Sequence, residues 1–247
     1  MKKNIVTILF AVLVALSATG QTNTDYPTFL NKHLVADHRC FLPAPPDTAS
    51  KAFEADTEAY RESKKLRNTS RGLLAVEDAD ISIDRTMKVM SDITGTELER
   101  TKCPNLFILI EKVMNDGYLS GSEAKKYYKR TRPFVYFNEP TSIPSEEESH
   151  RKTYSYPSSH SAMAWAATLV MTELFPECQN DLLHWGYEAG QSRVIAGYHY
   201  QSDVDAARLA ASAVVARLHA EKEFRRNMKK AEKEIRRIIK LQYLHKE

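Results

Sequence analysis

Apolar residues along this chain recur three or four positions apart, the spacing of one helix face, and no stretch alternates with the period of a strand. Glycine is scarce, with 8 in 247 residues, and helix-favouring residues dominate. The pattern therefore predicts an all-α fold, a single-domain helical bundle. The expected helices cover residues 49–65, 72–90, 106–114, 161–175, 181–190 and 204–220.

Polar and glycine residues between these stretches predict where helices begin and end. Thr96 and Glu99 have the spacing of a capping box and are expected to open a helix. Glycines within 117–121 are expected to end the helix over 106–114, and Ser122 to cap the next one. Residues 138–155 are polar and proline-marked, which predicts a long loop of the kind that is more often functional or disordered than incidental.

Both ends of the mature chain differ from the apolar centre. Residues 21–50 are polar and rich in proline, which predicts an extended arm packed on the body. Residues 221–247 predict a charged helix with one apolar stripe, suited to docking on the body or on a second subunit. The alternative for this helix is that its Lys/Arg face binds an acidic surface. The stripe comprises Phe224, Met228, Ala231, Ile235 and Ile238.

The first twenty residues have the composition of a targeting segment. Lys2 and Lys3 precede the apolar run 5–18, and small residues at 18–20 suit cleavage before Gln21. We expect residues 1–20 to be a cleaved signal peptide and 21–247 to be a periplasmic domain. An uncleaved membrane anchor is the alternative, although the run is shorter than the roughly 20 residues that a span requires.

Composition and cysteine content narrow the classes of function. The formal charge of +3 falls to +1 without Lys2 and Lys3, so overall charge gives no reason to expect nucleic acid. Cys40, Cys103 and Cys178 allow at most one internal disulfide, and their spacing fits no metal site.

Three separated segments carry candidate chemistry for an oxyanion. Lys125 and Arg132 lie seven residues apart, two helical turns, so both can point to one side. Pro133 disfavours helical geometry at Arg132 and is expected to end the helix there. An ammonium and a guanidinium in this arrangement can grip one phosphate from two directions. A basic run such as 125–130 is, however, more often a solvated face.

The second segment runs from Pro157 to His160, directly before an apolar helix. Free N–H groups at a helix N-terminus form an anion site, to which Ser158 can add a hydroxyl. His160 is placed to give a proton to a leaving oxygen. Simple helix capping is the alternative interpretation.

The third segment holds Arg193, His199 and Asp203. The spacing of His199 and Asp203 lets the carboxylate accept one ring N–H if the segment is helical, which leaves the other nitrogen as a nucleophile. A structural His/Asp pair is the alternative. A zinc site lacks a third ligand at usable spacing.

Together the three segments match Lys-x6-Arg-Pro, Pro-Ser-x-His and Ser-Arg-x5-His-x3-Asp. This signature resembles the type 2 phosphatidic acid phosphatase superfamily, and within it the bacterial class A non-specific acid phosphatases. The flanking residues 190–208 and 69–80 and the proline-rich arm are similar too, so the resemblance covers nearly all of the mature chain.

The resemblance implies an all-helical phosphomonoesterase that needs no metal or cofactor, acts on small phosphomonoesters, can transfer phosphate to alcohols and forms a homodimer. By the same analogy His199 is the nucleophile, His160 the proton donor and Asp203 the residue that orients His199. The phosphate oxygens are then held by Lys125, Arg132, Ser158, Ser159 and Arg193, with the loop amides.

The chain departs from the class at three positions. Tyr154 and Ser159 stand where glycine is usual, and Ala196 where cysteine can occur. If the site requires φ > 0 at Ser159, a serine there costs about 1–2 kcal/mol. A vanadate-dependent haloperoxidase and a non-catalytic phosphate-binding protein are the competing functions. An integral lipid phosphatase would need several spans that this sequence lacks.

Overall fold

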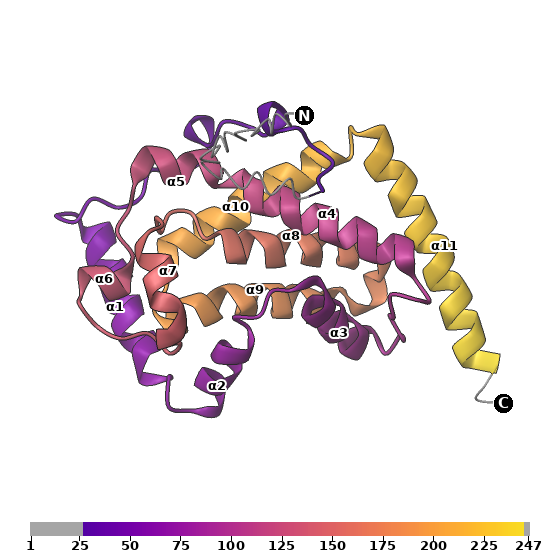
Figure 1. Cartoon of the computed structure of the whole chain (residues 1–247), viewed down its shortest axis with the longest axis horizontal. Helices are drawn as coiled ribbons and strands as arrows, with labels where there is room; N and C mark the ends of the chain where they lie inside the picture. The colour runs from indigo at the N-terminus through magenta and orange to yellow at the C-terminus, as the bar shows by residue number, and fades with distance from the viewer. Residues whose placement is uncertain (1–26, 245–247) are drawn as a thin grey trace, which may run out of the picture.

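The computed structural model describes residues 27–244, which contain helices and no strand (Figure 1). The predicted all-α fold is therefore confirmed. The elements are η1 (Lys32–Leu34), η2 (His38–Cys40), α1 (Lys51–Lys65), α2 (Ser70–Glu77), α3 (Ile83–Thr94), α4 (Pro104–Ser120), α5 (Ser122–Tyr128), α6 (Pro133–Tyr136), η3 (Pro144–Glu146), α7 (Glu147–Arg151), α8 (Ser159–Leu174), η4 (Pro176–Cys178), α9 (Gln179–Ala196), α10 (Gln201–Leu218) and α11 (Lys222–Leu244).

Helix α8 is the centre of the bundle and packs against α4, α9 and α10. Half of its buried residues are alanine, which lets the neighbouring helices come close. A Cβ on Gly117 of α4 would lie 2.8 Å from the carbonyl oxygen of Ala162. A Cβ on Gly186 of α9 would lie 2.3 Å from Oγ1 of Thr168. Gly117 therefore lies inside α4 and serves close packing, whereas the helix ends at Ser120 with Gly121 as its C-cap, within the predicted range 117–121.

Several helix boundaries differ from the prediction. The helix that carries Lys125 ends at Tyr128 and not at Arg132, because Lys129 has a left-handed backbone (φ 49°), and Ser122 is its first residue without a side-chain cap. The stretch 72–90 is two helices, because Asp80 accepts a hydrogen bond from Ser82 N (2.9 Å) and Ser82 caps α3. Thr96 and Glu99 open no helix. The hydroxyl of Thr96 bonds backward to Thr94 O (3.4 Å), and α4 begins instead at Pro104, whose missing N–H suits the first helical position.

The N-terminal segment is tied to the bundle through Asp116. This buried carboxylate of α4 accepts from the backbone N–H groups of Phe29 (2.9 Å) and Leu30 (3.0 Å). Burial raises the pKa of Asp116 to about 6. Residues 27–50 otherwise contain only the turns η1 and η2, and the predicted signal peptide lies outside the described residues.

Helix α11 lies along α4 at one end of the molecule (Figure 1). Its apolar stripe, including Phe224 and Ile235, is buried in the main core. The carboxylate of Glu234 accepts from the N–H groups of Asn105 (3.2 Å) and Leu106 (3.0 Å), two of the free donors at the start of α4. The stripe thus docks on the body of the same chain.

None of the helices between residues 27 and 244 is both long and apolar enough to cross a membrane. The thiols of Cys40, Cys103 and Cys178 are unpaired, and burial raises the pKa of Cys103 to about 11.

Candidate functional site

The three motif segments meet at the end of the bundle that carries α5, α6 and α7 (Figure 1). The side chains come from helix ends and loops, while α8, α9 and α10 supply the rigid frame. The structure brings together Lys125 of α5, Arg132 before α6, Ser158, Ser159 and His160 at the start of α8, Arg193 near the end of α9, and His199 and Asp203 around the start of α10.

His199 lies in a loop, and not on a helix as the spacing suggested. Helix α9 ends at Gly197, whose φ of 93° only glycine adopts easily, and the chain turns there toward His199. Arg67 supports the turn by donating to Ile195 O (2.7 Å) at the end of α9. Asp203 is in the first turn of α10 and accepts from Tyr200 N (2.9 Å), so the carboxylate that faces His199 also caps the helix.

The hydrogen bonds of His199 define its tautomer. Nη1 of Arg132 lies 3.0 Å from Nε2, and because arginine only donates, Nε2 carries the lone pair. Nδ1 therefore carries the proton, facing Asp203 Oδ2 and Ser155 Oγ, each at 3.4 Å. Burial, followed by the charge of Arg132, lowers the pKa of His199 well below 6.5. The ring is thus neutral, with Nε2 available as a base or nucleophile.

Arg130 holds Asp203 from the side opposite His199, a role that sequence reasoning missed. Its guanidinium donates to Asp203 Oδ1 and to Asp56 Oδ2, both at 2.6 Å, and lies 4.0 Å over the ring of Tyr200. Burial acts to raise the pKa of Asp203, but the charge of Arg130 and the bonds from His199 and Ser155 hold it below its usual value. Asp203 is therefore a permanent carboxylate.

Arg132 and Arg193 are buried and Lys125 is half-buried, and none of these three cations has a carboxylate partner within residues 27–244. Lys125 Nζ donates only to backbone, to Tyr154 O (2.8 Å) and Ser155 O (3.3 Å). Burial, followed by the charge of Arg132, lowers the pKa of Lys125 to about 7. Burial likewise lowers the pKa of Arg132 to about 10. Because these three positive charges lie close together without a counter-charge, they favour the binding of an anion between them.

Arg193 and His160 carry buried polar atoms that have no hydrogen-bond partner. Nε and Nη1 of Arg193 and Nε2 of His160 are buried and have no hydrogen-bond partner. Arg193 also lies 4.7 Å over the ring of Tyr198. Burial, then the charge of Arg193, lowers the pKa of His160 well below 6.5. Unpaired buried donors are costly, so their presence indicates a ligand site.

Ser158 caps α8, and Ser159 is the first residue of that helix. The Ser158 hydroxyl accepts from Ser161 N (3.2 Å) and Ser161 Oγ (2.8 Å), which leaves its own O–H free to donate. Ser158 N donates to Asp203 O (3.0 Å), joining this turn to the His199 segment. Ser159 is helical and has no positive φ, so the serine carries none of the strain considered for this position.

The segment 138–155, predicted as a loop, contains η3 and α7 and forms one wall of the site. His150 O accepts from Arg132 Nε (3.2 Å), and Thr153 Oγ1 accepts from Arg132 Nη2 (3.0 Å). The ring of His150, which joined no motif, lies 4.6 Å from that of Tyr198. The guanidinium of Arg132 is therefore held at several atoms before any ligand binds.

Asp78 and Arg71, which the sequence did not single out, stabilise α9 next to Arg193. Ser192 Oγ donates to Asp78 Oδ2 (2.5 Å) and accepts from Arg71 Nη1 (3.0 Å). Asp78 directly follows α2. Residues 69–80 are similar to the acid phosphatase class, but the sequence alone assigned them no role. Because Ser192 precedes Arg193, these contacts fix the helix turn that presents Arg193.

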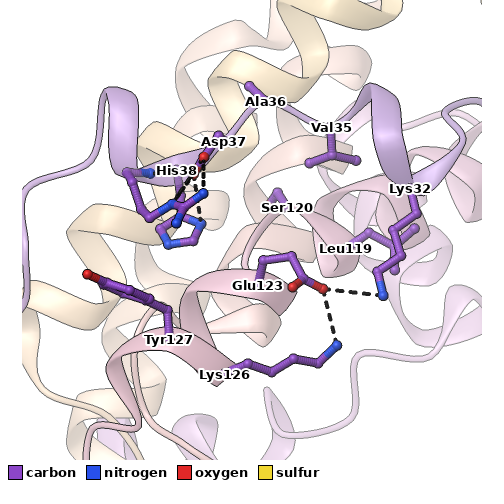
Figure 2. Close-up of a pocket in the computed structure, with 11 residues that line it drawn as sticks. Lys32, Val35, Ala36, Asp37, His38, Leu119, Ser120, Glu123, Lys126 and Tyr127 are labelled. Atoms are coloured by element: carbon purple, nitrogen blue, oxygen red, sulfur yellow. Dashed lines mark hydrogen bonds and ion pairs between the residues drawn. The ribbon is translucent and has the colours of Figure 1, made fainter.

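One cavity of about 440 Å³ lies apart from this site, between η1, η2 and the α4–α5 corner (Figure 2). Its charges pair with one another: Glu123 with Lys32 (3.2 Å) and Lys126 (3.1 Å), and Asp37 with Arg39 (2.6 Å). None of the predicted phosphate ligands lines it. Among residues 27–244, no group of three or more His, Cys, Asp or Glu side chains could hold a metal ion.

The fold and site define a helical bundle with a buried cationic pocket beside a His/Asp pair. A model of the PAP2 superfamily matches residues 105–226, which include every predicted site residue. A non-specific acid phosphatase from Providencia stuartii is 39% identical over 213 residues, 86% of each chain.

Further relatives agree. A non-specific acid phosphatase from Salmonella typhi is 38% identical, and the match covers 79% of this chain and 78% of that protein. An acid phosphatase from Zymomonas mobilis is 32% identical, and the match covers 89% of this chain and 83% of that protein. The chain belongs to the PAP2 superfamily, which confirms the resemblance seen in its motifs.

Proposed function

We propose that this chain hydrolyses a broad range of small phosphomonoesters through a phosphohistidine formed at His199. Its relatives over most of its length are named acid phosphatases, and the chain is an acid phosphatase enzyme of their superfamily. Beyond that class we propose the mechanism, the residue roles, transfer to alcohols and export.

The observation that carries the mechanism is a set of buried and half-buried cations, without a carboxylate partner among residues 27–244, beside a neutral histidine. Lys125, Arg132 and Arg193 surround a place where Nε and Nη1 of Arg193 are unpartnered. A phosphoryl group supplies the negative oxygens that these donors lack. Phosphoryl transfer needs mainly positioning and electrostatic stabilisation, which such a pocket provides.

In the first step, Nε2 of His199 attacks phosphorus while the ester P–O bond breaks. Arg132 moves its Nη1 donor from Nε2 to a phosphate oxygen, which frees the lone pair. His160 gives its proton to the departing alkoxide, and the alcohol leaves. Asp203 keeps Nδ1–H in place and stabilises the charge that develops on the His199 ring.

In the second step, water attacks the phosphohistidine. His160, now neutral, takes a proton from the water, the N–P bond breaks, and inorganic phosphate leaves with His199 restored. An alcohol in place of water yields a new phosphomonoester by the same step. Ser158, the amide of Ser159 and Arg193 hold the phosphoryl oxygens through both steps.

This chemistry is favoured at acid pH. His160 must be protonated when substrate binds, yet burial and Arg193 depress its pKa in the free protein. The protonated fraction of His160 therefore grows as the pH falls. The negative charge of a bound phosphate raises the pKa of His160 and increases that fraction. His199 remains neutral in this range because its own pKa is also depressed.

The decisive experiment compares wild type with His199→Ala at mildly acidic pH in EDTA, using p-nitrophenyl phosphate labelled in the phosphoryl group. We expect metal-independent turnover and an alkali-stable, acid-labile protein label in wild type only. Turnover that persists in the variant, or that needs an added divalent metal, would overturn the mechanism.

The same assay separates the competing functions. Phosphate binding without turnover by wild type would favour a binding protein. Oxidation of bromide by peroxide in the presence of vanadate, without phosphatase activity, would favour a haloperoxidase. Adding glycerol and measuring glycerol phosphate against inorganic phosphate tests transfer to alcohols.

We also propose that residues 1–20 direct export to the periplasm and are removed, and that the mature chain is a homodimer. The apolar run and the acid phosphatase relatives support export. N-terminal sequencing of protein from a periplasmic extract tests cleavage before Gln21. Analytical ultracentrifugation of the mature chain tests the dimer.

A further inference from the structure

The exposed side of helix α11 is a dense row of cations. Nine Lys or Arg and three Asp or Glu fall within Lys222–Leu244, a net charge of +6, whereas the whole chain carries +3. The rest of the chain is therefore acidic, with a net charge of −3. A charge asymmetry of this size between one helix and the remaining chain points to an interaction surface.

The cations share one face of the helix. At 3.6 residues per turn they occupy an arc of about 140°, opposite the apolar stripe that packs on the body. An open groove along this face is lined only by cations. Seven of the nine have no hydrogen bond or ion pair within residues 27–244, and all seven are exposed: Lys222, Arg226, Lys229, Lys230, Lys233, Arg236 and Lys240. We call these seven residues the cationic face.

Paired charges are the rule elsewhere on the surface. Lys88 pairs with Asp92 at 3.2 Å, Lys65 with Glu62 at 2.6 Å, and Lys102 with Glu97 at 2.5 Å. On α11 two of the three acidic residues are instead turned to the body: Glu234 caps α4, and Glu223 pairs with Lys112. The third, Glu232, is exposed at the border of the cationic face and forms no ion pair with it within residues 27–244. The cationic face is thus left without internal counter-charge.

We propose that the cationic face docks the protein on an anionic lipid bilayer. The helix has 23 residues and is about 35 Å long, so the row can lie flat along a charged plane. Leu244 falls within the arc of cations and Leu241 at its edge, and both are exposed at the C-terminal end, 57% and 48%. Exposed leucines beside lysines suit the boundary between headgroups and acyl chains, whereas a polyanion in water offers them no apolar contact.

The position of α11 suits such docking. The helix lies at the end of the bundle away from α5, α6 and α7, which frame the proposed catalytic site (Figure 1). Because the apolar stripe of α11 is already buried against α4, the helix cannot turn over and insert. Binding is therefore mainly electrostatic, reversible and sensitive to salt, and it leaves the catalytic end free.

The test uses the mature chain and sedimentation with vesicles of phosphatidylcholine alone or mixed with phosphatidylglycerol. We expect binding only to the mixed vesicles and its loss as salt is raised. Each Lys or Arg near an anionic surface contributes about fivefold to partitioning, so Arg226→Gln, Lys229→Gln, Lys230→Gln and Lys233→Gln combined should lower binding by roughly 600-fold.

A matched control removes four exposed cations from α1 and α3: Lys51→Gln, Arg61→Gln, Lys65→Gln and Lys88→Gln. It has the same total charge as the α11 variant and should keep binding within a few-fold of wild type. Circular dichroism melting of both variants checks that they are folded. Equal loss in the two variants would show a general charge effect and overturn the proposal.

Two other outcomes would also overturn it. Tighter binding to duplex DNA than to the anionic vesicles would assign the cationic face to a nucleic acid. Dissociation of an oligomer by the α11 variant, without any vesicle binding by wild type, would assign it to the acidic body of a second copy. Neither outcome depends on phosphatase activity, so this test stands apart from that of the catalytic mechanism.

Discussion

Arg130 bonds Asp203 at 2.6 Å, and both side chains are buried at the base of the site. Asp203 in turn faces Nδ1 of His199, so Arg130 acts on the proposed nucleophile through one intervening carboxylate. Asp56 of α1 completes the arrangement by accepting from the same guanidinium. A helix far from the motifs in sequence therefore takes part in positioning His199.

Replacing Arg130 should disturb both stability and the acid side of the pH profile. Arg130→Ala leaves two buried carboxylates without their cation, which costs about 3–5 kcal/mol. The pKa of Asp203, now held low by Arg130, should rise. The pH below which kcat falls should therefore move upward, and Arg130→Lys should restore part of both effects.

Thermal unfolding and kcat against pH measure this prediction. The control is Arg85→Ala, whose guanidinium pairs with the exposed Glu77 on the surface. A drop in kcat with an unchanged pH profile would mean that Arg130 is merely structural.

Arg193 should dominate the affinity for the phosphoryl group. Its unpartnered Nε and Nη1 are available for two charge-assisted bonds, each worth about 1.5–3 kcal/mol. Arg193→Ala should thus weaken competitive inhibition by inorganic phosphate at least tenfold. Arg208→Ala on α10 removes a partly buried arginine that bonds Tyr187 O and Asp205, and it should change the inhibition constant less than threefold. Equal inhibition constants for wild type and Arg193→Ala would contradict this role.

Anion binding should weaken as the pH rises through 7. The pKa of Lys125 is lowered to about 7 from 10.5, so the ammonium is present below that pH and lost above it. Arg132, with a pKa of about 10, remains charged throughout. Sulfate does not titrate in this range, so its inhibition constant reports the protein alone. It should rise between about pH 6 and 8 in wild type and stay flat in Lys125→Met; a flat wild-type curve would refute the prediction.

The sequence predicted which side chains come together better than it predicted the course of the chain between them. The motif residues were found because phosphate chemistry requires particular side chains at fixed spacing. Arg130 was missed because a cation inside a basic run has no local sign of burial; its partners Asp56 and Asp203 lie far away in sequence. The packing role of Gly117 was missed because a glycine that ends a helix and one that lets two helices touch look alike until the neighbour, Ala162, is known.

The geometry of the His199 segment was only half predictable. The contact with Asp203 was expected on the condition that the segment is helical, yet Gly197 ends α9, His199 lies in a loop and α10 starts after Tyr200. The contact survives because the carboxylate of a capping residue points back to the preceding loop. Spacing thus identified two side chains that the structure places 3.4 Å apart, for a geometric reason that differs from the one first considered.

Ser159→Gly should not improve the protein, although glycine is usual at this position in the class. Ser159 is the first helical residue of α8 and has no positive φ, so glycine relieves no strain. It adds backbone entropy to the unfolded state and should lower stability by about 0.5–1 kcal/mol. Denaturant unfolding measures the change, and kcat/KM should stay within threefold of wild type. A gain in stability would indicate strain that the backbone geometry does not contain.

The role of His160 should depend on the leaving group. The p-nitrophenolate ion departs without a proton, whereas an alkoxide such as that of glycerol phosphate needs one as the P–O bond breaks. His160→Ala should therefore reduce kcat/KM far more for glycerol phosphate, by about 10²–10⁴-fold, than for p-nitrophenyl phosphate. His150→Ala is the matched control, because that ring packs beside Tyr198 without an unpartnered nitrogen aimed at the site, and it should affect the two substrates equally. Parallel losses on both substrates in His160→Ala would mean that the ring serves binding, and that the proton comes from elsewhere.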